Sequence, residues 1–328
     1  MQLGRYRFFR ETVMLGITGA TGKIGIKVAD RLEKAGVKQR LIVRDPSRAP
    51  HLKNAEIAQV SSYGDAVGMK KALDGVETLF LVSARDIMGV TQQAALKGIT
   101  VPSYDRLQEQ ITAIDAAAAA GVGHIAYLSF LEAAENSVFV LSREHFHTEQ
   151  YIKNTGLSYT FLRPCLYMDN VSLRVSKDGI IRAPAGKGRA AWVTRDDIAD
   201  MAAAVLTGKG HENKTYDVTG PEALTMAETA QIIGAAAGKR VRYVALKPEE
   251  TRRLHNASGM DNFEEERRKL TGQGLEKEEV EIWVTHYTQI AAGALDVVSD
   301  SVSKLTGHKA QSLAEYLQKH PESYNYIR

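Results

Sequence analysis

In this 328-residue chain, the first residues whose types and spacing could do chemistry are three glycines, spaced three residues apart. They lie in the segment TGATGKIG, which runs from Thr18 to Gly25. Such glycines bring backbone N–H groups close to a diphosphate, and the N-terminus of a following helix attracts its negative charge. The spacing alone is a weak signal, because a glycine-rich turn without a ligand has the same pattern.

The elements expected around the glycines strengthen the diphosphate interpretation. An apolar run over residues 13–18 predicts a strand before them. After them, Ile24, Val28 and Leu32 recur at helical spacing and predict a helix that ends at Gly36. A strand, a glycine turn and a helix in this order predict a dinucleotide-binding site.

Each glycine has a separate task in such a turn. Gly19 permits the tight turn, Gly22 lets the backbone approach the diphosphate, and Gly25 allows the helix to pack on the strand. The other candidate residues of this phosphate site are Thr21, Lys23 and Ile24.

The tip of the second predicted strand distinguishes the two nicotinamide dinucleotides. An NAD site usually has an acidic residue there for the ribose 2′-hydroxyl, whereas an NADP site has arginine for the 2′-phosphate. The strand predicted over Arg40–Arg44 ends on Arg44, and Asp45 follows it. Successive side chains of an extended chain point to opposite sides, so Asp45 should turn away. The sequence therefore predicts NADPH, and a surface pair of Arg44 with Asp45 is the alternative.

Strand and helix patterns alternate through the first half of the chain. Strands are predicted over residues 40–44, 56–60, 77–83, 124–129 and 159–162. Helices are predicted over residues 65–73, 106–120 and 143–154. The strand at 77–83 is apolar on both faces, as a parallel sheet requires. This alternation predicts an α/β fold, a Rossmann-type doubly wound parallel sheet.

The second half predicts a smaller α/β lobe that supplies the substrate pocket. We expect an N-terminal extension at 1–12, an NADP(H)-binding domain at 13–165 and the C-terminal lobe at 166–328, with segments that can interleave. Thr194 is the predicted N-cap of a helix that ends at Leu206. Further elements are predicted at 215–219 (strand), 225–237 (helix), 240–246 (strand) and 248–320 (helical). Residues 84–103 are expected to be a lid or an inserted loop, either partly disordered or with a short helix.

Composition excludes several classes of function. The net charge of +3 is spread without a Lys/Arg-rich run, which argues against nucleic acid. Cys165 is the single cysteine, and no Cys/His spacing typical of a metal site occurs. No run of about 18 apolar residues is present. We therefore expect a cytoplasmic protein that binds neither metal nor membrane, while the quaternary state, a homodimer included, stays open.

Several segments carry a family resemblance. They are Thr18–Gly25, Ile42–Pro46 (IVRDP), His124–Ser129 (HIAYLS), Leu162–Asn170 (LRPCLYMDN) and Thr194–Ala199 (TRDDIA). With these segments the chain resembles the atypical short-chain dehydrogenase/reductases of the NmrA-like group, over roughly residues 14–320. Within the group it is most similar to the NADPH-dependent quinone oxidoreductases and triphenylmethane dye reductases. The group also contains regulators that bind NADP(H) without established turnover.

The expected catalytic residues differ from those of typical short-chain dehydrogenases. Those enzymes use a Tyr-x-x-x-Lys pair on a helix. The one such string here, Tyr243–Lys247, lies in a predicted strand before Pro248 and is interpreted as a coincidence. Where the pair belongs, this chain has His145, as the quinone and dye reductases similarly do. The resemblance implies that His145 contacts the nicotinamide ribose or the substrate and donates a proton, with Glu149 orienting it. A partly buried polar residue without a catalytic role is the alternative.

The resemblance also implies the walls of the pocket. Cofactor contacts are expected from Tyr63, Ser83, Ala84, Ser129, His145, Pro164, Cys165 and Leu166. Substrate contacts are expected from Phe130, Tyr167 and Trp192, with Tyr167 a second catalytic candidate. A quinone or dye needs little beyond a hydride donor held against a flat apolar surface. We therefore expect an NADPH-dependent oxidoreductase that reduces a quinone-like or conjugated electrophile, an apolar or aromatic small molecule. An NADP(H)-binding redox sensor without turnover is the alternative.

Overall fold

The first βαβ unit forms as the glycine segment predicts. The computed structural model describes residues 14–83, 106–257 and 277–327. In it, the fully buried strand β1 (Leu15–Thr18) leads through the glycine turn into helix α1 (Lys23–Lys34). This helix buries Ile24, Val28 and Leu32. The chain then enters β2 (Gln39–Val43), which pairs in parallel with β1.

Among the described residues, seven parallel strands form the main sheet, in the order β3-β2-β1-β4-β5-β6-β9. The remaining strands of this sheet are β3 (Ala55–Gln59), β4 (Thr78–Val82), β5 (His124–Leu128), β6 (Ser158–Pro164) and β9 (Lys214–Val218). The strand order reverses between β1 and β4, and ligands of doubly wound sheets bind beyond the carboxyl ends of the strands at such a point. The predicted Rossmann-type sheet is confirmed.

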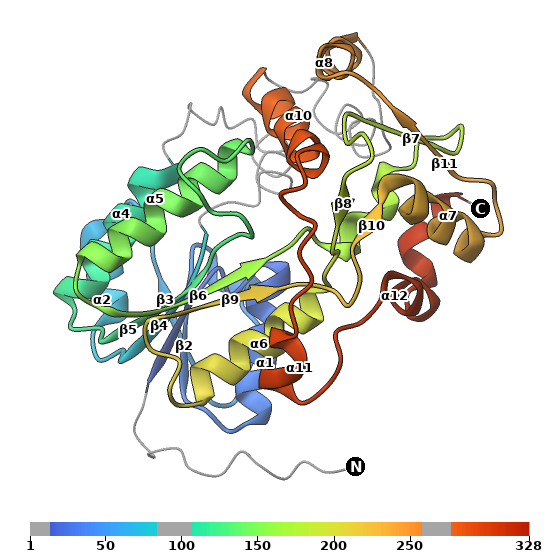
Figure 1. Ribbon diagram of the computed structural model, residues 1–328. Coiled ribbons are helices and arrows are strands. Elements are labelled where there is room, and N and C mark those ends of the chain that lie inside the picture. Colours follow the sequence, from blue (N-terminus) through green and yellow to red (C-terminus); the bar gives the residue numbers. More distant parts are fainter. Residues whose placement is uncertain (1–13, 84–105, 258–276, 328) are drawn as a thin grey trace.

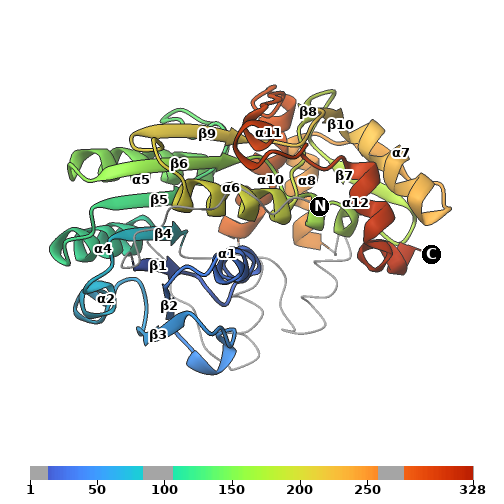
Figure 2. The same cartoon turned by 90° about the horizontal axis from the view of Figure 1, so that it is seen from below.

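Helices cover both faces of this sheet (Figures 1 and 2). One face carries α2 (Ala66–Leu73), α4 (Arg106–Ala119) and α5 (Val140–Asn154); the other carries α1, α6 (Arg195–Thr207) and α11 (Ser301–Thr306). The alternation along β4 shows why two cores form: Leu79 and Leu81 pack with α2 and α4, whereas Phe80 packs with α1 and α6. Every strand residue can be apolar because both faces are covered.

The described part of the second lobe contains two small sheets. In one, β7 (Ile180–Ala183) pairs in parallel with β11 (Arg242–Ala245); in the other, β8 (Arg189–Ala190) pairs antiparallel with β10 (Leu224–Thr225). Its helices are α7 (Met226–Ala237), α8 (Pro248–Ala257), α10 (Lys277–Ala291) and α12 (Leu313–Lys319). Short 3₁₀ helices are η1 (Pro46–Arg48), η2 (Met168–Asn170), η3 (Ser172–Arg174) and η4 (Pro321–Ile327). In Figure 1, α10 lies between α5 and the rest of this lobe.

Helix caps account for the boundaries that the sequence predicted well and for one that it missed. The Thr194 side chain accepts a hydrogen bond from the Asp197 N–H, and Thr225 forms a capping box with Glu228, both at predicted N-termini. Helix α5 begins at Val140, three residues before its predicted start. Its N-cap, Phe139, makes no side-chain hydrogen bond, so the usual polar signal is missing.

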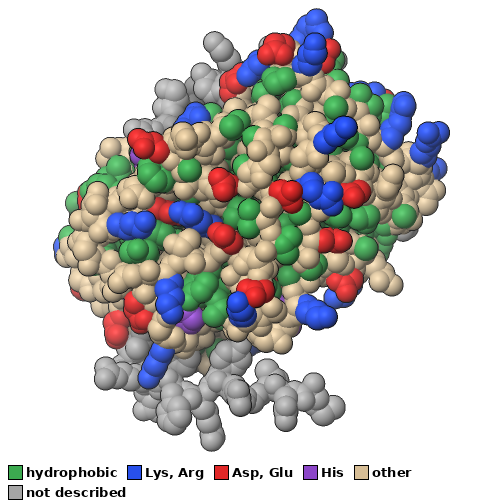
Figure 3. Space-filling view, viewed as in Figure 1, with side chains coloured by type: hydrophobic (Ala, Val, Ile, Leu, Met, Phe, Trp, Pro, Cys, Tyr) green, Lys and Arg blue, Asp and Glu red, His purple; other side chains and the backbone are tan. Residues whose placement is uncertain are grey.

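The chain returns to the main sheet after its first half. Strand β9 pairs with β6, and α6 packs on α1, so segments beyond residue 166 interleave with the NADP(H)-binding part. None of the described helices is long and apolar enough to cross a membrane. Basic and acidic side chains are interspersed on the face shown in Figure 3, the pattern of an ordinary solvated surface. The expected extension at 1–12 and the expected lid at 84–103 lie outside the described residues.

Candidate active site

The glycine turn has the geometry of a phosphate site. Gly19 adopts φ +61°, and its carbonyl accepts a hydrogen bond from the Gly22 N–H at 2.8 Å. A Cβ on Gly25 would lie 2.2 Å from the Gly19 oxygen, so only glycine lets the helix approach the turn this closely. The first turn of α1 has no side-chain cap and no acidic residue, and Gly22 and Lys23 are exposed. Its N–H groups thus face no competing carboxylate, and the turn fits a diphosphate.

Arg44 lies directly after β2 and is exposed at the same edge of the sheet. It forms no ion pair within residues 14–83, 106–257 and 277–327. Asp45 instead caps η1, where its Oδ1 accepts hydrogen bonds from the Ser47 N–H at 3.1 Å and the Ser47 hydroxyl at 2.6 Å. The position therefore fits the 2′-phosphate of NADP(H), as Asp45 is engaged in its own turn.

Tyr63 lies close to Gly19 of the glycine turn. Its ring is buried, and its hydroxyl donates a hydrogen bond to the Val82 carbonyl at 2.8 Å. Burial raises the pKa of this phenol. The Val82 N–H in turn donates to Thr18 Oγ1 at 2.9 Å. These bonds tie the tips of β1 and β4 together beneath the predicted cofactor site.

His145 lies on α5 in a buried hydrogen-bond chain. Its Nδ1 is 2.7 Å from the Tyr127 hydroxyl, which donates to Gln110 Oε1 at 2.9 Å, and its Nε2 is 3.1 Å from an Arg106 nitrogen. A guanidinium only donates, so Nε2 accepts and the proton resides on Nδ1. Burial and the positive charges of Arg106 and Arg163 hold the pKa of His145 well below its usual value. Such a lowered pKa favours the neutral ring, and the expected proton donation by His145 stays a prediction.

The hydrogen bonds of Glu149 go to residues other than His145, which corrects the expectation that Glu149 orients this ring. Its carboxylate is fully buried and accepts hydrogen bonds from the Ser129 hydroxyl at 2.6 Å and from Arg163 Nε at 2.8 Å. A second Arg163 nitrogen lies 2.5 Å from Glu149 Oε2. A buried carboxylate is strongly destabilising without a cationic partner, and here the partner is Arg163 on β6. Glu149 thus fixes Ser129, one of the predicted cofactor contacts.

Arg106, at the start of α4, was missed by the sequence reasoning. Its Nε donates to the Ser83 hydroxyl at 2.9 Å, and its Nη1 pairs with Glu144 Oε2 at 2.8 Å. Since Arg106 also contacts His145, it joins the tip of β4 to α5. An arginine at the start of a helix is usually exposed, and the sequence gives no signal that this one is buried. Ala84, the predicted neighbour of Ser83, lies outside the described residues.

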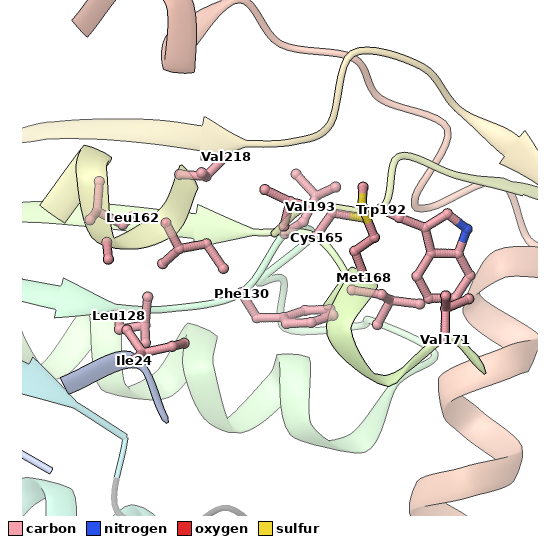
Figure 4. Close-up of a cluster of buried hydrophobic side chains, with 14 of the residues drawn as sticks. Ile24, Leu128, Phe130, Leu162, Cys165, Met168, Val171, Trp192, Val193 and Val218 are labelled. Atoms are coloured by element: carbon pink, nitrogen blue, oxygen red, sulfur yellow. The ribbon is translucent and has the colours of Figure 1, made fainter. Parts of the chain in front are cut away.

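The predicted pocket walls after β5 and β6 come together. The Leu131 N–H donates to the Pro164 carbonyl at 2.9 Å, and Phe130 lies near Cys165 (Figure 4). Leu166 belongs to the same buried cluster. Phe130 stacks on the His145 ring, with centroids 6.2 Å apart. Burial raises the pKa of the Cys165 thiol to about 12, which removes it as a nucleophile.

The two predicted aromatic contacts from the second lobe have different environments. Tyr167 is half-buried, with the Arg195 guanidinium 4.9 Å from its ring centre. Trp192 is only 2% exposed, and its indole N–H donates to Thr229 Oγ1 at 3.2 Å. The structure thus places Trp192 in the core next to Met168 (Figure 4), and a substrate contact by Trp192 stays a prediction.

One group of possible metal ligands occurs among the described residues, away from this site. Ligand atoms of Asp197, Asp200 and His308 lie within 4.8 Å of one another. Asp200 already accepts a hydrogen bond from Arg31 Nε at 2.5 Å and contacts His308 Nε2 at 3.2 Å. These partners neutralise the carboxylate, and we assign no metal to the group.

The buried, neutral state of His145 predicts a pH dependence of stability. The unfolded chain takes up a proton at this histidine below about pH 6.5, while the folded chain does not. Stability therefore falls as the pH drops from about 7 to about 5 and is unaffected by this group above about 7.5. In urea titrations, His145→Gln should reduce this loss by about 1–2 kcal/mol. The control His147→Gln alters an exposed ring and should leave it unchanged. An equal slope in both variants would contradict the prediction.

Comparison with known proteins identifies the family. The profile of the NmrA-like family matches residues 11–317. The chain belongs to the NmrA-like family. It is 31% identical to an NAD(P)H azoreductase of Xenophilus azovorans over 95% of this chain and 99% of the relative.

Two solved structures extend the comparison. The first is the NADPH-dependent quinone oxidoreductase of Escherichia coli complexed with NADPH, with TM-score 0.78 and 31% identity, covering 93% of this chain and 99% of the other. The second is the Citrobacter sp. triphenylmethane reductase complexed with NADP(H), with TM-score 0.74, 32% identity, and coverage of 93% and 99%. The predicted family, fold, oxidoreductase class and NADPH cofactor are confirmed.

Proposed function

We propose that this NmrA-like protein reduces quinones and related conjugated electrophiles with NADPH. The observation that carries the proposal is His145, which stands in the helix where typical short-chain dehydrogenases have the Tyr/Lys pair and lies buried between Tyr127 and Arg106. A quinone accepts hydride without a strong protein acid, because its oxygens can take protons from solvent. The names of the azoreductase, quinone oxidoreductase and triphenylmethane reductase relatives support this class of acceptor.

Different residues at the carboxyl edge of the sheet would bind different parts of NADPH. The first turn of α1, with Gly19, Gly22 and Lys23, would hold the diphosphate, and Arg44 the 2′-phosphate. When bound, NADPH supplies the hydride. Ser83 and Ser129, each fixed by a hydrogen bond to a buried charged group, would position the nicotinamide end.

The acceptor would lie against the aromatic side chains after β5 and β6. Phe130, stacked on His145, offers a flat apolar surface, and the half-buried Tyr167 offers a second. His145 would act as a positioning residue, because its two ring nitrogens are engaged by Tyr127 and Arg106. Proximity and orientation would supply most of the acceleration.

Steady-state NADPH consumption with a panel of quinones, azo dyes and triphenylmethane dyes tests the proposal. Turnover with at least one neutral quinone is expected. NADPH binding is measured in parallel by the change in nicotinamide fluorescence. Tight binding with no turnover on any acceptor would contradict the reductase and support the redox-sensor alternative.

The pH profile of the rate tests the role given to His145. Burial and the charges of Arg106 and Arg163 hold the pKa of this ring well below its usual value. We therefore expect kcat for a quinone to change by less than about twofold between about pH 6 and about pH 8. A tenfold fall with an apparent pKa near about 6.5 that disappears in His145→Gln would show that the imidazolium does act as an acid.

A further inference from the structure

A buried arginine in the second lobe has no anionic partner among the residues that the structure describes. Arg174, the last residue of η3, is 7% exposed. Its Nε and Nη1 atoms are buried without a hydrogen-bond acceptor, and no carboxylate within the described ranges pairs with it. Burying an unpaired charge lowers stability, so such a group in a native structure calls for a function.

Aromatic side chains of α10 hold the guanidinium in place. Its central carbon lies 3.9 Å from the ring centre of Trp283 and 5.6 Å from that of Tyr287. Cation–π contacts offset part of the cost of burial and fix the plane of the group. They leave its Nε and Nη1 donors, which lie in that plane, available for an acceptor. Either of these donors forms a planar fork together with Nη2, and such a fork matches the two oxygens of a carboxylate or of a related oxyanion.

His286, on α10, adds a second polar group that has no hydrogen-bond partner for one ring nitrogen among the described residues. Its Nε2 atom is buried without a hydrogen-bond partner, and its ring lies 5.9 Å from that of Trp283. Burial and the charge of Arg174 lower its pKa well below the usual value, so the ring is neutral. A neutral imidazole carries one N–H and can donate a hydrogen bond to an oxyanion beside Arg174.

A continuous series of ring contacts joins this cluster to the candidate active site. The His286 ring lies 5.6 Å from the Phe139 ring, and Phe139 lies 5.4 Å from Phe130. Phe130 in turn stacks on His145 at 6.2 Å. The first two of these contacts are edge-to-face, and together the rings form an aromatic path from the proposed acceptor position toward Arg174.

We propose that Arg174 and His286 bind an oxyanion substituent of the acceptor, a carboxylate, sulfonate or phosphate, while its conjugated ring lies against Phe130. This inference rests on the proposed reductase function. It makes Arg174 a specificity-determining residue, one that favours anionic aromatic acceptors over neutral acceptors of the same shape.

Calorimetric binding to the full chain, without turnover, tests the anion site directly. The probes are 2-naphthoate, naphthalene-2-sulfonate and 2-naphthyl phosphate, with the neutral 2-naphthamide as the matched ligand. At least one anion should bind about tenfold or more tightly than the amide, as expected for hydrogen bonds to a charged group. Comparison of the three anions distinguishes the oxyanions. Equal affinity for all four ligands would overturn the proposal.

Three variants separate the site from a general charge effect. Arg174→Gln should remove the anion preference, whereas Arg240→Gln, which alters an exposed arginine of the same lobe, should retain it. Arg174→Lys keeps the charge without the planar fork and should lose most of the preference for 2-naphthoate, and it replaces the glutamine variant if that fails to fold. A preference that persists in the Gln or Lys variant would contradict the assignment.

Turnover then links the anion site to the reaction. The ratio of kcat/KM for 1,2-naphthoquinone-4-sulfonate to that for 1,2-naphthoquinone should fall about tenfold in Arg174→Gln, with the neutral quinone within about twofold of wild type. An equal fall for both quinones would contradict a specificity role. If no quinone is reduced at all, the proposed function fails, yet the calorimetry still decides whether the anion site exists.

Discussion

Replacing Arg163 by methionine is expected to lower the free energy of unfolding by about 3 kcal/mol. The substitution leaves the fully buried Glu149 carboxylate without its cation. Among the described residues, its remaining side-chain hydrogen-bond partner is the Ser129 hydroxyl. An uncompensated buried charge is among the most destabilising changes in a protein. Urea denaturation monitored by circular dichroism at pH 7 measures the effect.

Two further variants make the Arg163 prediction specific. Arg182→Met breaks a more exposed pair with Asp178 and should cost less than about 1 kcal/mol. The double variant Glu149→Leu with Arg163→Met removes both charges and should be more stable than Arg163→Met alone. A loss in Arg163→Met as small as that in Arg182→Met would show that the Glu149 charge does not depend on Arg163.

The second large effect concerns the choice of cofactor. Arg44→Ala is expected to weaken NADPH binding by about a hundredfold while leaving NADH binding within about twofold, because NADH has no 2′-phosphate for the guanidinium to contact. Fluorescence titration with each dinucleotide measures the two dissociation constants. The exposed position of Arg44 after β2 makes a folding defect in this variant unexpected.

A charge-matched control completes the cofactor test. Lys38→Ala removes an exposed cation just before β2, at the opposite end of the same strand, and should leave both dissociation constants unchanged. Equal losses for NADPH and NADH in Arg44→Ala would mean that Arg44 does not contact the 2′-phosphate. A loss in Lys38→Ala would show instead that the effect comes from net charge.

Local signals explain how much of the fold could be predicted. The apolar strands, the spacing of Ile24, Val28 and Leu32, and the caps Thr194 and Thr225 each act within a few residues, so the sequence displays them directly. The two-residue strands β8 and β10 are too short to show a period. Strand β9 shows a pattern, but its place beside β6 depends on contacts between distant segments.

The candidate site likewise combines features that are local in the sequence with features that depend on the tertiary structure. The sequence by itself determined the glycine turn and Arg44, because a tight turn and a strand tip are local features with a fixed relation to a dinucleotide. Only the tertiary structure decided the state of His145, which depends on Arg106 and Tyr127 from two other elements. Likewise, only folding pairs Glu149 with Arg163 and leaves Arg174 buried against Trp283. The physical reason is that burial and the nearest charge set the behaviour of an ionisable group, and both are supplied by residues far away in the sequence.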